Sequence, residues 1–243
     1  MKIYSQIIAE MKSLANEEQG QNLSRFFKTG PGQYGEGDIF LGIKVPVQRQ
    51  VAKKYFSASL DDIKKLLASP VHEHRLVGLL ILVSQYEKAD EDRQEEIAQF
   101  YLKNLKAVNN WDLVDLSTPK ILGHYFFRHL PKRLSVEVCQ TINALADSKN
   151  IWERRVAMLS TFYAIYQGRY QETVIIAKKL LNDKHDLIHK AVGWMLREMG
   201  KRAGREHLLA FLDKNLANMS RTTLRYAIEH LPENERQAYL KKK

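Results

Sequence analysis

The chain has 243 residues, carries a formal net charge of +10 and is 44% hydrophobic and 27% charged, a composition typical of a globular protein with a sizeable core. No window reaches the roughly 18 uninterrupted apolar residues of a membrane-spanning helix, and the N-terminal segment lacks the apolar stretch of a secretory signal. The single cysteine, Cys139, excludes an internal disulfide and a cysteine-rich zinc site, so we expect a reducing, cytoplasmic compartment and a buried, inert thiol.

The excess of positive charge is confined to one part of the chain. Residues 1–148 hold 19 basic and 18 acidic residues, whereas residues 149–243 hold 19 basic and 10 acidic residues. This asymmetry indicates a polyanionic partner, and nucleic acid before any other. The alternative is charge that serves only solubility.

Apolar residues recur with helical spacing along most of the chain, and no regular run of short alternating strands interrupts this pattern. Ser59 is a predicted helix cap, Pro46 suits a first helical turn, and Pro70, Pro131 and Pro232 mark boundaries. The predicted helices cover 2–16, 19–27, 46–56, 60–68, 71–87, 90–106, 110–127, 132–146, 150–166, 170–182, 185–202 and 204–216, with a short pair after 220.

The segment 28–38 is the one long non-helical stretch near the N-terminus, and it holds four of the 12 glycines. A long loop in a helical chain is more often functional or mobile than neutral. It lacks the Gly-Lys-Ser/Thr ending of a phosphate-binding loop. A surface connector and a functional loop both stay open.

A repeat of about 40 residues is visible along the chain. Its units begin at Val71, Asn109, Lys149 and Lys184, at intervals of 38, 40 and 35 residues. Each unit opens with polar residues and continues as an apolar helix, followed by a more amphipathic helix such as 90–106 or 170–182. Helix pairs at this period predict an all-α fold, a curved α-solenoid of HEAT-like repeats over 1–243, with the polar starts of the inner helices on its concave face.

The predicted helix that begins near 110 joins an indole to a carboxylate. Trp111 and Asp115 are four residues apart and share a helix face. Asp112 falls in the first turn, where an acid serves capping. Asp115 lies between Val114 and Leu116, so it requires either a structural partner or a functional cleft. Pro119 is expected to kink or break this helix.

Two later helices carry further candidates. Trp152 follows the apolar spacing and is a predicted core residue. Arg154 or Arg155 could neutralise a phosphate or hold a carboxylate, and the alternative, which the residues alone favour, is an ordinary arginine at the surface or the core rim. Trp194 has Lys190 and Arg197 on its face, a pattern that suits a base or sugar between phosphates as well as a core tryptophan with basic neighbours. The eight histidines form no metal-ligand motif, so we expect no metal.

Four runs together resemble one known family. The runs NWDLVDLSTP from Asn110, NIWERRVAML from Asn150 and IHKAVGWMLRE from Ile188, with the glycine-rich TGPGQYGEGD from Thr29, look like the AlkD-like family of DNA alkylation repair glycosylases. The resemblance extends from about residue 3 to residue 235, in consistent order and spacing.

The resemblance implies a HEAT-like solenoid whose concave, basic face holds duplex DNA. It implies hydrolysis of the N-glycosidic bond of positively charged alkylated purines, chiefly 3-methyladenine and 7-methylguanine, without cofactor, metal or lyase step. By this match Asp115 resembles the catalytic aspartate, Trp111 and Trp194 resemble the tryptophans at the lesion-bearing nucleotide, and Arg155 resembles the arginine at the backbone. Lys190 and Arg197 are candidate DNA contacts beside Trp194.

The sequence departs from the pattern at Asn110 and Phe26, where relatives can carry another aromatic residue and a tyrosine. The partner expected is duplex DNA with alkylated bases and no membrane, bound by a monomer in the cytoplasm or on the nucleoid. The alternatives are a DNA- or RNA-binding solenoid without catalysis and a protein-interaction scaffold.

Overall fold

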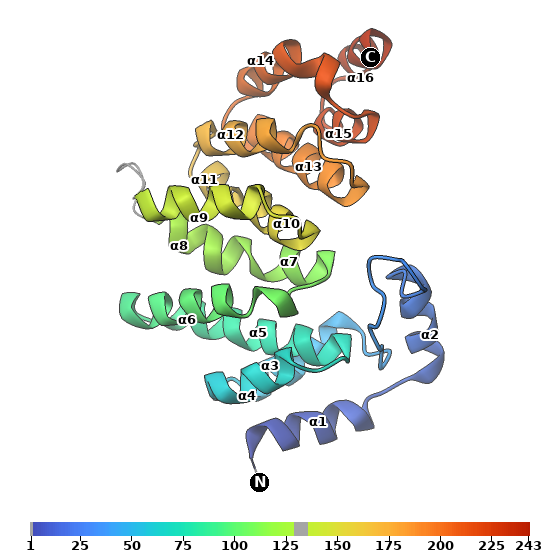
Figure 1. The fold of residues 1–243 in the computed structure, drawn as a ribbon, viewed down its shortest axis with the longest axis vertical. Coiled ribbons are helices and arrows are strands. Elements are labelled where there is room, and N and C mark those ends of the chain that lie inside the picture. The colour runs from blue at the N-terminus through green and yellow to red at the C-terminus, as the bar shows by residue number, and fades with distance from the viewer. Residues whose placement is uncertain (1, 129–135) are drawn as a thin grey trace. The chain divides into compact units, whose positions relative to one another are not determined.

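The computed structural model describes residues 2–128 and 136–243, and in this part the regular elements are helices (Figure 1). An isolated bridge pairs Ile39 with Val71. The predicted all-α solenoid class is confirmed. Contacts divide the chain into two compact units, Met1–Ser117 and Thr118–Lys243, each described below by itself, and the single domain over 1–243 stays a prediction.

The first unit is built around one central helix, α5. Its flanking elements include α3 and α4, which pack on it, and α6 and α7, which follow it (Figure 1). Because α5 has neighbours on several sides, residues all round it, such as Leu76, Leu79 and Ile81, are almost fully buried. The elements are α1 (Ile3–Ser13), α2 (Glu17–Phe26), α3 (Val45–Lys54), α4 (Leu60–Leu67), α5 (His72–Lys88), α6 (Glu91–Lys103), η1 (Leu105–Ala107) and α7 (Trp111–Ser117).

The second unit is built around α13, which contacts α10, α11, α12, α14 and α15. Its closest approach is to α15 at Gly193, where an added Cβ would lie 2.5 Å from the Tyr226 Cβ. The elements are η2 (Pro119–Gly123), α8 (His124–Phe127), α9 (Val136–Ala146), α10 (Ile151–Ser160), α11 (Phe162–Tyr166), α12 (Gln171–Leu180), α13 (Asp186–Arg202), α14 (Arg205–Asn215), η3 (Leu216–Asn218), α15 (Arg221–Ala227) and α16 (Glu233–Lys242).

The predicted repeat corresponds to real helix pairs. Its four apolar helices are α5, α7, α10 and α13, and consecutive members touch within each unit, α5 against α7 and α10 against α13. The more amphipathic partners, α6 and α12, pack beside them. Helices that each bury one face against the next pair are the stacking unit of an α-solenoid.

Local signals place the helix boundaries. The Ser59 side chain accepts a hydrogen bond from the Asp62 backbone, and the Asp62 carboxylate accepts one from the Ser59 backbone, which completes a capping box. Pro46 lies in the first turn of α3 as predicted. Pro119 ends the helix that starts at Trp111, and a π-type turn follows, so the predicted break is confirmed.

Two expectations need correction. The helix predicted over 150–166 is interrupted at Thr161, where the buried Ser160 and Thr161 hydroxyls donate to the Ala157 and Met158 carbonyls; such bonds compete with the helical ladder. The Cys139 thiol, expected to be buried, is partly exposed on α9.

The expectation of a buried Trp152 is confirmed, since its side chain is almost fully buried. Residues 132–135 of the helix predicted over 132–146, and the boundary expected at Pro131, lie outside the described residues. Among the described residues, no helix is both long and apolar enough to span a membrane.

Candidate functional site

Helix α7 places an indole and a carboxylate side by side in the first unit. Trp111 opens the helix and Asp115 follows one turn later, and both side chains are half-buried while Leu113 and Val114 between them are fully buried. The 3.6-residue period therefore brings both groups to the less buried face of the helix. This pairing is the one that the four-residue spacing predicts.

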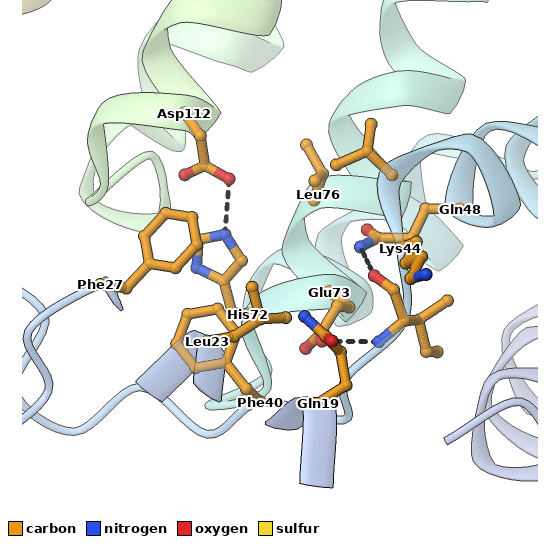
Figure 2. Close-up of a pocket in the computed structure, with 12 residues that line it drawn as sticks. Gln19, Leu23, Phe27, Phe40, Lys44, Gln48, His72, Glu73, Leu76 and Asp112 are labelled. Carbon is orange, nitrogen blue, oxygen red and sulfur yellow. Dashed lines mark hydrogen bonds and ion pairs between the residues drawn. The ribbon is translucent and has the colours of Figure 1, made fainter. Parts of the chain in front are cut away.

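Aromatic rings continue from Trp111 into the first unit. The Phe27 ring stacks on Trp111 with centroids 5.2 Å apart, and Phe40 stacks on Phe27 at 5.0 Å. The imidazole of His72 lies 4.6 Å from the Phe40 ring. Figure 2 shows Phe27, Phe40 and His72 gathered beneath Asp112. The exposed Phe26 ring meets Trp111 edge-on at 6.0 Å.

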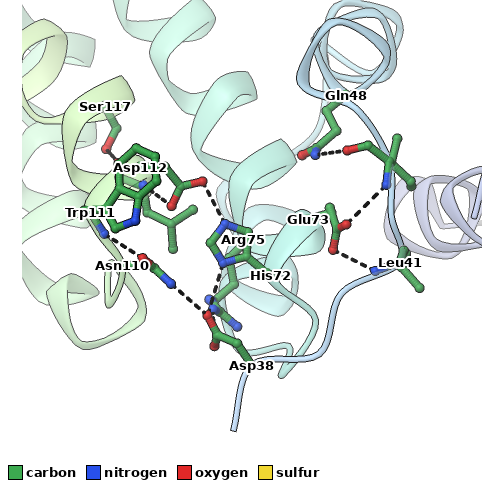
Figure 3. A network of polar contacts seen from close by, with 12 residues as sticks. Asp38, Leu41, Gln48, His72, Glu73, Arg75, Asn110, Trp111, Asp112 and Ser117 are labelled. Atoms are coloured by element: carbon green, nitrogen blue, oxygen red, sulfur yellow. Dashed lines mark hydrogen bonds and ion pairs between the residues drawn. The ribbon is translucent and has the colours of Figure 1, made fainter. Parts of the chain in front are cut away.

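A buried charged network holds the start of α7 (Figure 3). The His72 imidazole lies between two carboxylates, with Nε2 2.8 Å from Asp112 and Nδ1 3.1 Å from Asp38. Arg75 donates to the other Asp38 oxygen at 2.6 Å, and Asn110 donates to Asp38 at 3.3 Å. All five side chains are buried, so each charge depends on the others.

The network fixes the protonation of its own members. Burial alone would lower the pKa of His72, but the hydrogen bonds to Asp112 and Asp38 outweigh it and raise the pKa to about 9. Burial alone would raise the pKa of Asp38, but the hydrogen bond from His72 and the charge of Arg75 lower it. At neutral pH the His72 imidazole is therefore a cation beside the Asp38 carboxylate.

Hydrogen bonds also hold both ends of α7. At its start the Asp112 carboxylate accepts from the Leu113 backbone at 2.8 Å, so Asp112 serves the first turn as expected and also pairs with His72. At its end the Ser117 hydroxyl lies 2.7 Å from the Tyr101 hydroxyl. A helix fixed at both ends holds Trp111 and Asp115 in a defined orientation.

The loop 28–38 is closed on itself and ends in this network. The Gly35 backbone donates to the Lys28 carbonyl at 3.1 Å, and an added Cβ on Gly35 would lie 2.4 Å from the Phe27 carbonyl oxygen. Asp38, its last residue, carries the contacts to His72 and Arg75. The loop thus helps to hold the N-terminal end of α7 in place.

Sequence reasoning missed His72, Asp38 and Arg75 as supports of the site. Their contacts join positions 34 to 40 residues apart, which helical periodicity does not report. The signal that could have found them is the polar run His72 to Arg75 at the start of a helix that is otherwise apolar.

The second unit carries the other four candidate residues, on α10 and α13. Arg155 is 5% exposed and donates to the Leu187 carbonyl in the first turn of α13 at 2.6 Å. Trp194 is half-buried, with its ring centroid 6.2 Å from that of Phe162. The neighbouring Arg154 pairs with Asp183 at 2.6 Å.

The two basic residues beside Trp194 hold acidic partners. Lys190 lies 2.8 Å from Asp186 one turn earlier on α13, while Arg197 pairs with Glu229 and Glu198. Both side chains are partly exposed. In a complex with DNA, phosphate groups would replace these carboxylates as the anionic partners of the two side chains. Their roles as DNA contacts stay predictions.

Together the paired helices, the fixed carboxylate beside an indole and the cationic second unit define a helical-repeat protein suited to an anionic polymer. The sequence from 7 to 231 matches the family model described as DNA alkylation repair enzyme. The chain belongs to that family and has its role in the repair of alkylated DNA.

A solved structure described as a predicted DNA alkylation repair enzyme from Enterococcus faecalis is similar in fold. It superposes with a TM-score of 0.68 over 90% of this chain and 97% of its own, at 16% sequence identity. Comparison with curated proteins gives no match.

Proposed function

We propose that this chain is a monofunctional DNA glycosylase. It hydrolyses the N-glycosidic bond of positively charged alkylated purines, such as 3-methyladenine and 7-methylguanine, in duplex DNA and leaves an abasic site. The observation that carries the proposal is the Asp115 carboxylate one turn from Trp111, on a helix fixed at both ends. The proposed protein acts as a monomer, without cofactor or metal.

The chemistry needs little more than these groups. An alkylated purine that carries a positive charge is already a good leaving group, so no general acid is required. As its bond to the sugar breaks, positive charge develops on the deoxyribose. A preorganised carboxylate at Asp115 stabilises that charge and orients a water molecule on the anomeric carbon.

The aromatic groups supply selectivity for a cation. The face of Trp111, backed by the stacked Phe27 ring, attracts positively charged or polarised C–H groups by about 0.5–2 kcal/mol. Trp194 offers a second half-buried indole in the other unit. Neither indole face distinguishes bases by their hydrogen-bond donors and acceptors, so selectivity depends on the positive charge of the lesion.

The second unit supplies the contacts to the DNA backbone. Arg155, Lys190 and Arg197 are the candidate phosphate ligands there, and phosphate contacts position a duplex without reading its sequence. Arg155 is held by the Leu187 carbonyl, so its guanidinium is preorganised rather than mobile.

Base release from methylated duplex DNA tests the proposal. Asp115→Asn removes the negative charge with little change of shape, and we expect excision to fall by about 10²–10³-fold while DNA binding is retained. Asp147→Asn is the matched control, since Asp147 is an exposed carboxylate paired with Lys179. Release of methylpurines by Asp115→Asn at the wild-type rate would refute the catalytic role. Binding without release by the wild type would favour a nucleic-acid-binding solenoid.

A further inference from the structure

The two ends of the glycine-rich loop 28–38 meet at Trp111. Phe27 stands directly before the loop, and Asp38 is its last residue. The sequence alone does not distinguish a surface connector from a functional loop. The contacts of the two ends favour the functional loop, because one end holds the ring of Trp111 and the other holds its backbone.

Phe27 holds the ring. It stacks on the Trp111 indole with centroids 5.2 Å apart and ring planes at 12°, and it is itself 7% exposed. Phe27 also stacks on Phe40 at 5.0 Å. A ring packed in this way cannot turn freely, so the indole has a fixed aromatic surface against it.

Asp38 holds the backbone through one intermediate residue. The Asp38 carboxylate accepts a hydrogen bond from Asn110 Nδ2 at 3.3 Å, and Asn110 Oδ1 accepts one from the Trp111 backbone N–H at 2.8 Å (Figure 3). Asn110 is 0% exposed, so water does not compete for its amide. Two hydrogen bonds in series therefore connect the end of the loop to the first residue of α7.

Asp38 is itself fixed to α5, the central helix of the first unit. Its carboxylate accepts from Arg75 at 2.6 Å and lies 3.1 Å from His72 Nδ1. The carbonyl of Ile39, the residue after the loop, accepts from the His72 backbone N–H at 2.9 Å. The bonds through Asn110 therefore fix Trp111 relative to α5.

The loop between these ends is braced by its own polar groups. The Gly32 backbone donates to the Glu36 carboxylate at 2.8 Å. The Gly30 backbone donates to Gln33 Oε1 at 3.0 Å. Compact loops whose ends lie close together and whose own side chains fill them are frequently functional.

We propose that Asn110 and the loop 28–38 are positioning elements for Trp111, which hold its indole in the orientation that meets the lesion-bearing nucleotide. The inference rests on the proposed glycosylase function, in which the indole face attracts the positive charge. A displacement of about 1 Å can cost about 10²-fold in rate, whereas affinity for DNA depends chiefly on phosphate contacts. Loss of the hold therefore slows base release more than it weakens DNA binding.

The mobility of the Trp111 ring is measured in the whole chain without DNA. The chain has 3 tryptophans, so a spectrum of labelled tryptophan resolves their indole N–H signals by NMR, and Trp111→Phe assigns the signal of interest. In Asn110→Ala we expect the heteronuclear NOE of the Trp111 indole to fall, because the ring gains fast motion. The NOE of Trp194, in the second unit, should stay unchanged.

Base release and DNA binding are measured separately on methylated duplex DNA. In single turnover we expect Asn110→Ala to slow release by about tenfold to a hundredfold, with the Kd for the duplex changed by less than about twofold. Asn104→Ala is the matched control, since it loses an amide hydrogen bond of 2.7 Å to the Phe100 carbonyl in the same unit. It should leave the release rate and the Trp111 NOE unchanged.

Two further variants separate the contacts. In Asn110→Asp the aspartate can still accept from the Trp111 N–H but cannot donate to Asp38, so we expect slow release, as in Asn110→Ala. Phe27→Leu removes the ring at the other end of the loop, and release should again slow while the Kd is retained. Urea unfolding confirms that each variant is folded.

Each contrary result is distinct. Release at the wild-type rate by Asn110→Ala and Phe27→Leu would overturn the inference. Asn110→Asp equal to the wild type beside a slow Asn110→Ala would also overturn it, because the bond to Trp111 alone would then explain Asn110. If the wild type releases no methylpurine, the glycosylase proposal fails, and the NOE of Trp111 still decides whether Asn110 holds the indole.

Discussion

At the scale of single residues, His72 makes the stability of the network at the N-terminal end of α7 depend on pH. Its pKa is raised from 6.5 to about 9 because the bonds to Asp112 and Asp38 outweigh its burial. A group whose pKa is raised on folding stabilises the native state fully below its unfolded pKa and loses that contribution as pH rises through its folded pKa. We therefore expect the free energy of unfolding to fall by up to about 3 kcal/mol between pH 6.5 and pH 10.

Urea unfolding across this pH range measures the effect. In His72→Gln the loss attributable to this residue should disappear, with lower stability at pH 7 because two buried carboxylates lose their cation. His74→Gln is the control, since burial lowers the pKa of His74, so that residue is neutral in both states above about pH 7.5. A wild-type loss that persists unchanged in His72→Gln would contradict the assignment.

At the scale of helices, the close contact of α13 with α15 depends on one missing side chain. An added Cβ at Gly193 would lie 2.5 Å from the Tyr226 Cβ and 2.6 Å from the Thr223 carbonyl oxygen. In a helix free of neighbours, Gly→Ala is stabilising by about 1 kcal/mol. Here we expect Gly193→Ala to destabilise by about 1–3 kcal/mol, because the two helices must move apart.

Thermal and urea unfolding of Gly193→Ala measure this change, and its sign decides the question. A gain in stability would show that the two helices do not meet so closely. A loss, with helix content unchanged by circular dichroism, would confirm the contact. Because Trp194 is the next residue, weaker binding to methylated duplex DNA is expected alongside the loss.

The helices of this molecule were predictable from its sequence, but some of their breaks and contacts were not. The helices and the Trp111–Asp115 pair follow from the 3.6-residue period, and the break at Pro119 follows from its missing N–H. The break at Thr161 was not foreseen, because it depends on hydroxyls that are buried only in the folded unit. The contact of Asp38 with His72 spans 34 residues, and no local pattern reports which distant polar groups will meet.

At the scale of the whole molecule, the two parts of the chain differ in net charge. Residues 149–243 carry 19 basic and 10 acidic residues, and several of those acids are paired with arginines, as in Arg154–Asp183, Arg202–Glu198 and Arg205–Glu235. Exposed lysines provide much of the remaining charge. Such a distribution favours association with phosphates along a duplex rather than with a protein surface.

Salt dependence of binding to undamaged duplex DNA tests this distribution. About six neutralised phosphates would make the logarithm of the association constant fall with the logarithm of salt concentration with a slope near −5. Two quadruple Lys→Gln variants, each removing four exposed positive charges, compare the two units: Lys178, Lys184, Lys201 and Lys214 in the second, and Lys12, Lys53, Lys64 and Lys65 in the first.

The second-unit variant should bind more weakly and with a shallower slope than the first-unit variant, because it removes charge from the part of the chain where the excess lies. Urea unfolding of both variants controls for stability, which exposed lysines alter little. Equal slopes would mean that the second unit holds no larger share of the phosphate contacts. A wild-type slope near zero would remove the argument for a polyanionic partner and leave a protein-interaction scaffold as the better account of the repeats.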